Sequence, residues 1–450
     1  MEILDLLSAV GSVRKAESLD PSQVQQLQKT RFRKLLKHAL RNSTFYRRFY
    51  SEHGITERDL DALVPEDLPI IDKEVMMANY DDFVTDSALK RVDLERFINE
   101  SPAPDSTYKK RYHVVHTSGS SGIIGLFVYG RREWAVGKAL ALRTTGIDLP
   151  LYRRKRIAFI AATDGHFASV ASFCNLPRFL FKRLPLSISS SIEEIREQID
   201  RFKPDAITGY ASGLNLLAQE QLEGRISIAP REAFCTGDPL TAALRQRIED
   251  AFGVNPVNMY GSSETMTLAG ECSVHHRLHL FSDWFSVQVV DGDLKPARSG
   301  RVVITNLYNY TQPLIRYQMS DEIVMSDEAC PCGLPFPVIE NIAGRHEEFL
   351  WFDRGNGRKD FIHPIVLAEF FVPGLEKFQF TQTSPKTLVM KAVVHGEASG
   401  IVAAIRGKMN KILSGKLLEQ RVRFDIELVD EIRNDPKTGK FRLIIPYAGQ

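Results

Sequence analysis

The sequence has little of several things, and each scarcity narrows what the protein can be. Cysteine is scarce, at 5 of 450 residues, and an odd, small number favours a reduced cytoplasmic protein over a disulfide scaffold. The formal net charge is only +2 at pH 7, which argues against a nucleic-acid-binding protein. No apolar run approaches the roughly 20 residues of a membrane span, and the first residues lack the basic and then apolar pattern of a secretory signal. These scarcities predict a cytoplasmic protein without a nucleic-acid or membrane partner.

What is present predicts an α/β protein of more than one domain. A length of 450 residues with 43% apolar and 25% charged residues fits two or three globular domains. Residues 1–105 show helical periodicity, and from about 110 short β-rich runs alternate with helical ones, as in a parallel, helix-covered sheet. The ranges 285–290, 300–305 and 312–317 predict a β-rich subdomain at about 280–346. The remainder reads as a small α+β unit. We therefore expect an N-terminal domain over 1–346 and a C-terminal domain over 347–450.

One stretch is composed almost entirely of small and hydroxylated residues. After His116 come Thr117, Ser118, Gly119, Ser120, Ser121 and Gly122, between two β-rich runs. Glycine lets the backbone approach a ligand closely, and each hydroxyl adds a rotatable donor, so a hairpin loop of this composition could hold a phosphate. It is not a Walker loop, because Gly-x4-Gly-Lys-Ser/Thr is absent. On this stretch alone, a Ser/Gly-rich surface turn explains the composition equally well.

Four further motifs follow this loop in order along the chain. They are Thr236-Gly237-Asp238-Pro239-Leu240, Tyr260-Gly261-Ser262-Ser263-Glu264, Pro313-Leu314-Ile315-Arg316-Tyr317 ending at Asp321, and Gly344-Arg345-x-Glu347-Glu348 with a late Pro436-Lys437-Thr438-Gly439-Lys440. Together the set resembles the adenylate-forming superfamily, and most closely its phenylacetate–CoA ligase branch and the related capsule-biosynthesis enzymes. The sequence departs from the family after Gly122, where Ile123-Ile124 replace the usual Lys-Pro, so one phosphate-binding cation is missing.

The resemblance implies an ATP-dependent acid ligase. Such an enzyme forms an acyl-adenylate, releases pyrophosphate and passes the acyl group to an acceptor, here most simply coenzyme A. Alternatives are a carrier-protein thiol or an amine as acceptor, an adenylyl transferase, and a non-catalytic relative that only binds nucleotide or acyl ligands. The substrate would be a small carboxylic acid, with aromatic acids as one option. Members of this branch are often dimers, so a homodimer is a further option.

The resemblance also assigns roles to residues. The ATP-binding set would be Thr117, Ser118, Gly119, Ser120, Ser121, Gly122, Gly237, Asp238, Tyr260, Gly261, Ser262, Ser263, Asp321 and Arg345. Lys440, Glu264 and Arg345 would be catalytic, with Glu264 holding Mg²⁺, whose preference for hard oxygen ligands a carboxylate meets. Glu347 would be the hinge about which a mobile C-terminal domain turns. His166, Phe167 and Tyr210 fall where the family lines its acyl pocket, although aromatic core packing explains Phe167 and Tyr210 as well.

The cysteines supply a separate set of residues. Cys272, Cys330 and Cys332, with His279 as the fourth member, match the Cys3His composition of a structural zinc site. His275 and His276 are alternatives to His279. The Cys-x-Cys spacing is shorter than the usual Cys-x2-Cys, and reduced buried cysteines in a turn remain an alternative. Four protein ligands leave no open position, so any zinc here would be structural.

Overall fold

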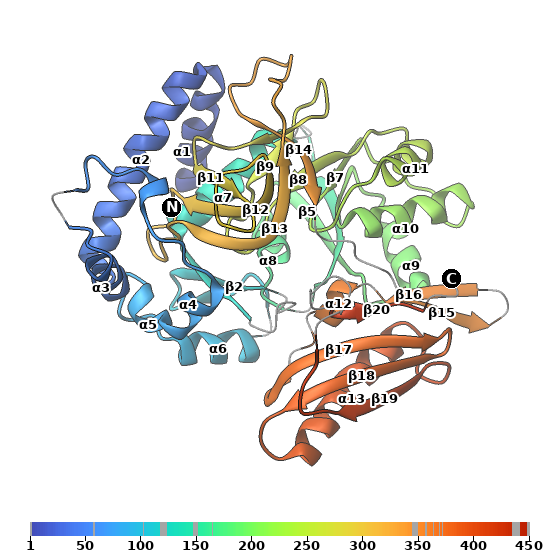
Figure 1. The fold of residues 1–450 in the computed structure, drawn as a ribbon. Coiled ribbons are helices and arrows are strands. Elements are labelled where there is room, and N and C mark those ends of the chain that lie inside the picture. Colours follow the sequence, from blue (N-terminus) through green and yellow to red (C-terminus); the bar gives the residue numbers. More distant parts are fainter. Residues whose placement is uncertain are drawn as a thin grey trace.

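The computed structural model describes residues 2–56, 59–101, 103–117, 124–146, 152–163, 165–343, 350–355, 358–362, 364–368, 370, 372–433 and 442–447. Figure 1 shows a helical N-terminal segment beside a large twisted sheet, with a smaller C-terminal unit packed below them. The α/β fold class is confirmed. Among the helices of the described residues, none is both long enough and apolar enough to cross a bilayer.

The N-terminal segment is helical, as its periodicity predicts. Its helices are α1 (Glu2–Lys15), α2 (Pro21–Asn42), α3 (Thr44–Glu52), α4 (Lys73–Ala78), α5 (Tyr80–Phe83) and α6 (Arg91–Glu100). Asp20 begins α2 by accepting a hydrogen bond from the Gln23 amide (2.9 Å), with Pro21 in the first turn. Ser43 ends α2 and begins α3, because its hydroxyl accepts from the Tyr46 amide at 3.3 Å.

The centre of the molecule is one eleven-stranded sheet, ordered β11-β12-β13-β14-β10-β9-β8-β7-β6-β4-β5. Its parallel part consists of β4 (Lys155–Ala161), β5 (Phe181–Ser187), β6 (Ala206–Gly209), β7 (Glu232–Cys235) and β8 (Val257–Tyr260). The connecting helices are α8 (Ala168–Cys174), α9 (Ile192–Phe202), α10 (Ala211–Leu222) and α11 (Ala242–Phe252). This alternation of parallel strands and helices is the one predicted from the sequence.

The rest of the sheet is antiparallel. It consists of β9 (Ala269–Glu271), β10 (Leu278–Leu280), β11 (Phe285–Val290), β12 (Ser299–Asn306), β13 (Tyr317–Met325) and β14 (Val338–Ala343). The predicted strand at 312–317 is wrong, since the strand begins at Tyr317. Gln312 is fully buried, and its side chain accepts from the Val128 amide (2.8 Å) and donates to the Leu126 carbonyl (3.0 Å). The Gln312 side-chain amide thus forms hydrogen bonds with the backbone of β3, and these bonds hold the segment before Tyr317 as a loop.

A small three-stranded sheet precedes the large one. It contains β1 (Thr107–Tyr108), β2 (Tyr112–His116) and β3 (Leu126–Gly130), followed by helix α7 (Arg131–Thr145). Strands β2 and β3 pair antiparallel, with His116 opposite Leu126. The predicted hairpin on either side of the Ser/Gly/Thr loop is therefore confirmed.

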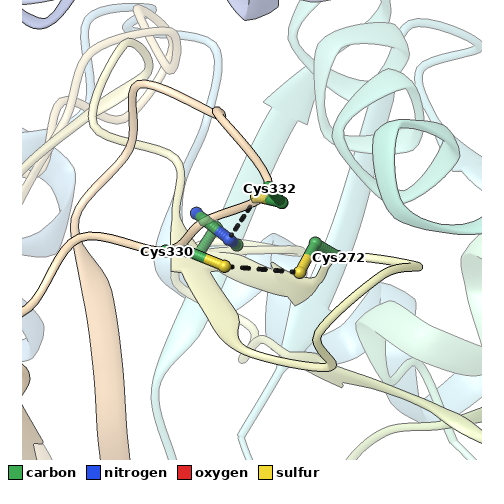
Figure 2. Close-up of side chains that lie close together, drawn as sticks. Cys272, Cys330 and Cys332 are labelled. Carbon is green, nitrogen blue, oxygen red and sulfur yellow. Dashed lines mark hydrogen bonds between the residues drawn. The ribbon is translucent and has the colours of Figure 1, made fainter.

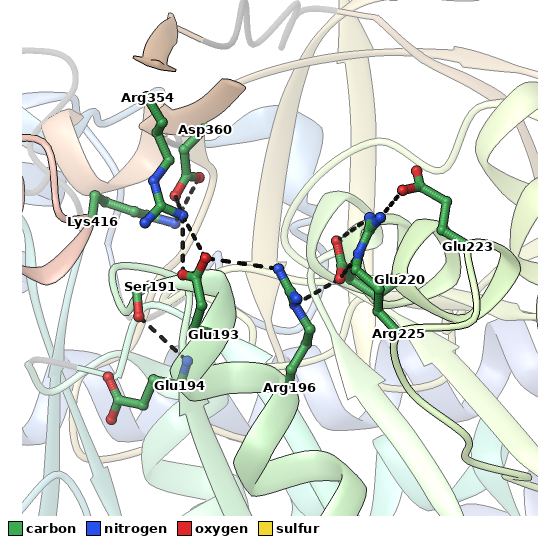
Figure 3. A network of polar contacts seen from close by, with 10 residues as sticks. All are labelled: Ser191, Glu193, Glu194, Arg196, Glu220, Glu223, Arg225, Arg354, Asp360 and Lys416. Carbon is green, nitrogen blue, oxygen red and sulfur yellow. Dashed lines mark hydrogen bonds and ion pairs between the residues drawn. The ribbon is translucent and has the colours of Figure 1, made fainter. Parts of the chain in front are cut away.

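The C-terminal unit contains a hairpin, a four-stranded sheet and two helices. Its elements are β15 (Leu350–Gly355), β16 (Arg358–Ile362), α12 (Pro364–Ala368), β17 (Leu375–Ser384), β18 (Thr387–Val394), α13 (Ala398–Gly415), β19 (Arg423–Leu428) and β20 (Ile444–Ile445). Arg354 of β15 reaches across to Glu193 of α9, donating to both carboxylate oxygens at 3.0 Å (Figure 3). Apolar side chains of this unit and of the parallel strands belong to one buried cluster. The two parts of the chain are therefore joined by both apolar and ionic contacts.

Candidate active site

The base of the Ser/Gly/Thr loop is closed by two hydrogen bonds between Thr117 and Gly125. The Thr117 amide donates to the Gly125 carbonyl (2.9 Å), and the Gly125 amide donates to the Thr117 hydroxyl (2.8 Å). Ser118, Gly119, Ser120, Ser121 and Gly122 lie outside the described residues. The structure therefore fixes where this loop starts and ends.

The Tyr-Gly-Ser-Ser-Glu stretch lies against this loop base. The Ser263 hydroxyl donates to the His116 carbonyl at 2.8 Å, and the Tyr129 hydroxyl donates to the Ser263 carbonyl at 2.7 Å. The Asn306 side chain donates to the Glu264 carbonyl at 3.0 Å. Strands β2, β3 and β12 thus hold one short stretch of backbone, which fixes the Glu264 side chain beside Thr117.

These elements enclose a polar cavity of about 110 Å³. Of the residues predicted to bind ATP, it brings together Thr117, Gly237, Gly261, Ser262, Ser263, Glu264 and Asp321. These residues come from segments as far apart in sequence as 117 and 321, and they meet at the carboxyl ends of the parallel strands. Ligand sites of open α/β sheets form at such an edge.

Two buried carboxylates face this cavity. Glu264 and Asp321 are each 6% exposed. Among the described residues, the Glu264 carboxylate takes part in no hydrogen bond or salt bridge. A buried, unpaired carboxylate beside hydroxyl groups suits a hard divalent cation such as Mg²⁺. The donor set therefore fits the predicted magnesium role.

His116 closes the cavity beside Thr117. Burial lowers the pKa of its imidazole to about 4, so the ring is neutral at pH 7. Its Nε2 accepts a hydrogen bond from the His166 amide at 3.3 Å, and the ring lies on Phe167 with 4.4 Å between centroids. The neutral ring therefore links β2 to the segment at 165–167 without adding charge to the site.

Gly237 also lines the cavity, and Asp238 follows it in the chain. Gly237 has φ of +83°, and a Cβ there would lie 2.6 Å from the Tyr210 ring, so only glycine fits. The Asp238 carboxylate accepts from the amides of Ala211 (2.5 Å) and Ser212 (3.1 Å) and so caps α10. Asp238 does not line the polar cavity, and its role in ATP binding stays a prediction.

The residues predicted for the acyl pocket separate into two groups. Phe167 and Tyr210 line the polar cavity, whereas His166 is buried against Phe97, with 5.4 Å between ring centroids. Tyr260, predicted to stack on adenine, lines a neighbouring apolar cavity. These roles stay predictions.

A second site lies at the edge between β10 and β14. The ligand atoms of Cys272, His279, Cys330 and Cys332 all lie within 4.8 Å of one another, and Figure 2 shows the three thiol groups facing a common point. The Sγ atoms of Cys272 and Cys330 are 3.8 Å apart, and Cys332 Sγ is 3.3 Å from His279 Nε2. Two sulfurs bound to one zinc at about 2.3 Å on tetrahedral corners would be about 3.8 Å apart.

His279 is the histidine that joins this cluster. Its Nδ1 lies 3.2 Å from the Phe336 carbonyl, and donation there leaves Nε2 directed at the thiols, as in protein zinc sites. His276 instead lies 3.3 Å from the Asn255 side chain, and His275 is exposed. The ligand set chosen first from the sequence is the one that the fold brings together.

The chain was compared with known proteins. No family model matches it. It is 25% identical over 367 residues to the phenylacetate-coenzyme A ligase of Thermus thermophilus, covering 78% of this chain and 77% of that protein. It is 21% identical over 444 residues to the Protein CapK of Staphylococcus aureus, covering 93% and 88%.

Solved structures of CoA ligases have the same fold as this chain. A 2-hydroxyisobutyryl-CoA ligase in complex with 2-HIB-AMP and CoA superimposes with a TM-score of 0.61 at 20% identity, covering 96% of this chain and 91% of that one. In its postadenylation state with R3-HIB-AMP the TM-score is 0.60 at 19% identity, covering 97% and 92%. The resemblance to the adenylate-forming ligases is confirmed. Within that superfamily, the sequence similarity is to phenylacetate–CoA ligases and CapK.

Three residues that the adenylate-forming motifs single out cannot be placed. Arg345, Glu347 and Lys440 lie outside the described residues. Their assigned roles stay predictions.

The cavity also contains residues that the motifs missed. Lys73 at the start of α4, His116 and Ser320 all line it. Lys73 is the important one, because Ile123-Ile124 replace the cation that follows the phosphate loop in the family. Lys73 belongs to none of the motifs, so no sequence pattern indicated that it lies in a site.

Proposed function

We propose that the chain is an ATP-dependent, AMP-forming carboxylic acid ligase that transfers its acyl group to coenzyme A. The observation that carries the proposal is the polar cavity, which gathers hydroxyl, carboxylate and lysine groups from separate motifs at one edge of the sheet. The ligases similar in sequence and fold support the same reaction class.

The reaction has two balanced steps. The acid's carboxylate oxygen attacks the α-phosphorus of ATP and the bond to pyrophosphate breaks, which gives an acyl-adenylate. The thiol sulfur of coenzyme A then attacks the acyl carbon, AMP leaves, and the thiol proton is released. Both steps spread negative charge over phosphate oxygens, so positioning and electrostatics carry the catalysis.

Several residues of the cavity and of the motifs have a matching task in this reaction. The Thr117 hydroxyl and the residues 118–122 would hold the phosphates of ATP, and Asp321 would accept from the ribose hydroxyls. Glu264 would hold Mg²⁺, which neutralises phosphate charge when bound. Arg345 and Lys440 are proposed at the ribose or phosphate and at the bridging oxygen, on their motifs alone.

The acceptor and the setting are also proposals. Coenzyme A is preferred because the 2-hydroxyisobutyryl ligase with this fold is described with CoA bound. A carrier-protein thiol, an amine acceptor and a homodimer stay alternatives. All five cysteines are free thiols, which fits the cytoplasm.

We further propose that Cys272, His279, Cys330 and Cys332 hold a structural zinc ion. The Cys3His composition and the spacing of the ligand atoms support this. The ion would join the loop before β14 to the β9–β10 turn.

The experiment that tests the ligase is pyrophosphate release with ATP, Mg²⁺ and a panel of acids, each with and without coenzyme A. We expect acid-dependent release that coenzyme A stimulates, with formation of the acyl thioester. A Glu264→Gln variant should lose most of this activity. Release that coenzyme A does not stimulate would contradict the proposed acceptor. Saturable ATP binding without release for any acid would contradict the ligase and favour a binding protein.

A further inference from the structure

The polar cavity adjoins a second, larger cavity with mostly apolar walls. The volume of this apolar cavity is about 410 Å³. Both cavities share the residues Ala168, Ser169, Thr236, Gly261 and Met266 in their walls. A ligand bound beside Thr117 and Glu264 in the polar cavity would therefore extend directly into apolar surroundings.

One wall of the apolar cavity is a single face of the parallel sheet. Lys155, Ile157 and Phe159 alternate along β4, and all three line it. Side chains two residues apart on a strand share a face. Along β7 the lining runs from Thr236 at the polar cavity back to Glu232, a span of roughly 13 Å at about 3.3 Å per residue. The cavity therefore extends away from the phosphate end along the strands.

Helices form the other walls. The contributing side chains include Ile3, Leu6, Leu7 and Val10 of α1, Ala141 and Leu142 of α7, and Ser172 and Phe173 of α8. Ile3, Leu7 and Phe179 line the cavity and are 46%, 61% and 62% exposed. The apolar wall thus continues to the outside of the molecule at the end away from Glu264.

The amino ends of the strands carry no net charge into the cavity. Lys155 and Glu232 pair there, with 2.5 Å between Nζ and Oε2. Because the two charges offset each other, this end does not attract a second carboxylate. The other lysine of the lining, Lys138 of α7, donates to the Asn175 side chain at 2.8 Å. The sheet face toward Lys155 is therefore expected to contact an uncharged part of the occupant, whose one carboxylate lies toward Glu264.

Met266 stands between the two cavities. A Cβ on Gly137 would overlap its sulfur, so glycine at 137 makes room for this side chain. The unbranched thioether can change rotamer to follow a ligand's shape. Met266 is therefore expected to change its side-chain conformation when a ligand occupies both cavities.

We propose that the apolar cavity holds the tail of the acid substrate, and that this substrate is an unbranched aliphatic monocarboxylic acid of medium to long chain. The inference rests on the proposed ligase function. A single aromatic ring would fill only the part near Met266 and leave the sheet face toward Lys155 in contact with water. A flexible alkyl chain covers the length of that face, and burial of its methylene groups is favourable.

The test measures pyrophosphate release with straight-chain acids of four to sixteen carbons and with phenylacetate. We expect kcat/KM to rise by about fourfold per added methylene group until the cavity is filled, and to exceed the value for phenylacetate. Ser172→Phe and Ala141→Phe should each lower kcat/KM for the best long acid at least tenfold and shift the optimum to shorter acids. Lys182→Phe is the matched control, because Lys182 follows Phe181 on β5, is exposed and does not line the cavity.

The outcomes separate the tail inference from the ligase proposal. Pyrophosphate release that is independent of chain length, or fastest with phenylacetate, overturns the tail inference and keeps the ligase. The same dependence of kcat/KM on chain length in the wild type, Ser172→Phe and Ala141→Phe also overturns the tail inference. Calorimetry with dodecanoate alone gives a readout without turnover. If Ser172→Phe and Ala141→Phe lose dodecanoate binding and Lys182→Phe keeps it, the assignment of the cavity is supported. This holds even if no acid causes pyrophosphate release. Absence of pyrophosphate release would overturn the ligase proposal alone.

Discussion

At the scale of single residues, Lys73 makes the sharpest prediction. It lines the polar cavity with Thr117, Glu264 and Asp321, and its Cε lies 3.4 Å from where a Cβ on Gly125 would be, beside the loop base. We expect Lys73→Ala to lower kcat/KM for ATP in pyrophosphate release by about 10- to 100-fold, because a charge-assisted hydrogen bond contributes about 1.5–3 kcal/mol. Lys73→Arg should keep part of the activity.

The matched control for Lys73 is Lys90→Ala. Lys90 also lies at the start of a helix and is exposed, with its amine 3.4 Å from Asp81. It should leave kcat/KM unchanged. Equal activities for Lys73→Ala and the wild type would show that this lysine does not act on the phosphates.

The placement of residues in the cavity was predictable only where a motif carried them. The Tyr-Gly-Ser-Ser-Glu stretch indicated Glu264, and the structure places it beside Thr117 and Asp321. Lys73 was missed because it reaches the site through the packing of α4, and no local pattern records that packing. The same reason explains the apolar cavity, whose walls come from α1, α7, α8 and the five parallel strands β4 to β8. No one of these stretches has a composition that distinguishes a cavity wall from a packed core.

At the scale of elements, the Cys3His cluster connects two β-hairpin regions. Cys272 follows β9, His279 lies in β10, and Cys330 and Cys332 precede β14. We expect purified protein to contain one zinc ion, and Cys330→Ser to lose it and to unfold at a lower temperature. A loss of about 2 kcal/mol would lower Tm by roughly 2–4 °C, because the entropy of unfolding is large for a domain of this size. Pyrophosphate release at low temperature should survive, because the ion would be structural. Metal analysis and calorimetry measure both.

Cys174→Ser is the control for the zinc prediction, since Cys174 lies in α8, apart from the cluster. It should keep the metal. A zinc-free wild type with all thiols reactive would remove the site. A Cys330→Ser variant that keeps its Tm and loses adenylation would contradict a structural role.

Elements with strong periodicity were predictable and those held by distant side chains were not. Helix α9 was predicted with its observed bounds, because three isoleucines at helical spacing mark its buried face and Ser191 caps it. The strand expected at 312–317 failed because Gln312 bonds to the backbone between Leu126 and Gly130. Apolar content suggested a strand there, whereas the buried amide decides the conformation. A sequence pattern cannot record such a distant partner.

At the scale of the whole molecule, the joint between the sheet and the C-terminal unit contains a chain of charges. Arg354 binds Glu193 of α9, and Glu193 lies 3.8 Å from Arg196, which pairs with Glu220 of α10 at 2.7 Å (Figure 3). Behind Arg354, Asp360 and Lys416 are 4% and 1% exposed, with 3.6 Å between their charged atoms. The resemblance predicts that this unit turns about Glu347, and such a turn would separate Arg354 from Glu193.

The Glu193–Arg354 contact should therefore set how firmly the unit is docked. Glu193→Lys places two like charges together, and we expect amide hydrogen exchange in β15 and β16 to quicken by about fivefold, or about 1 kcal/mol for a partly exposed pair. Arg354→Glu should act similarly. The double reversal Glu193→Arg with Arg354→Glu should slow exchange only in part, because Arg196 lies 3.8 Å from the Glu193 carboxylate and Asp360 lies 3.9 Å from the Arg354 guanidinium. The single variants should also change the ratio of pyrophosphate release to thioester formation, whereas a reversal at the exposed pair Arg201–Glu197 should change neither. If exchange is slow in every variant, the apolar contacts alone hold the unit in place. Rotation of the unit between adenylation and thioester formation would then have to break those apolar contacts. Breaking them would cost more free energy than breaking this ion pair.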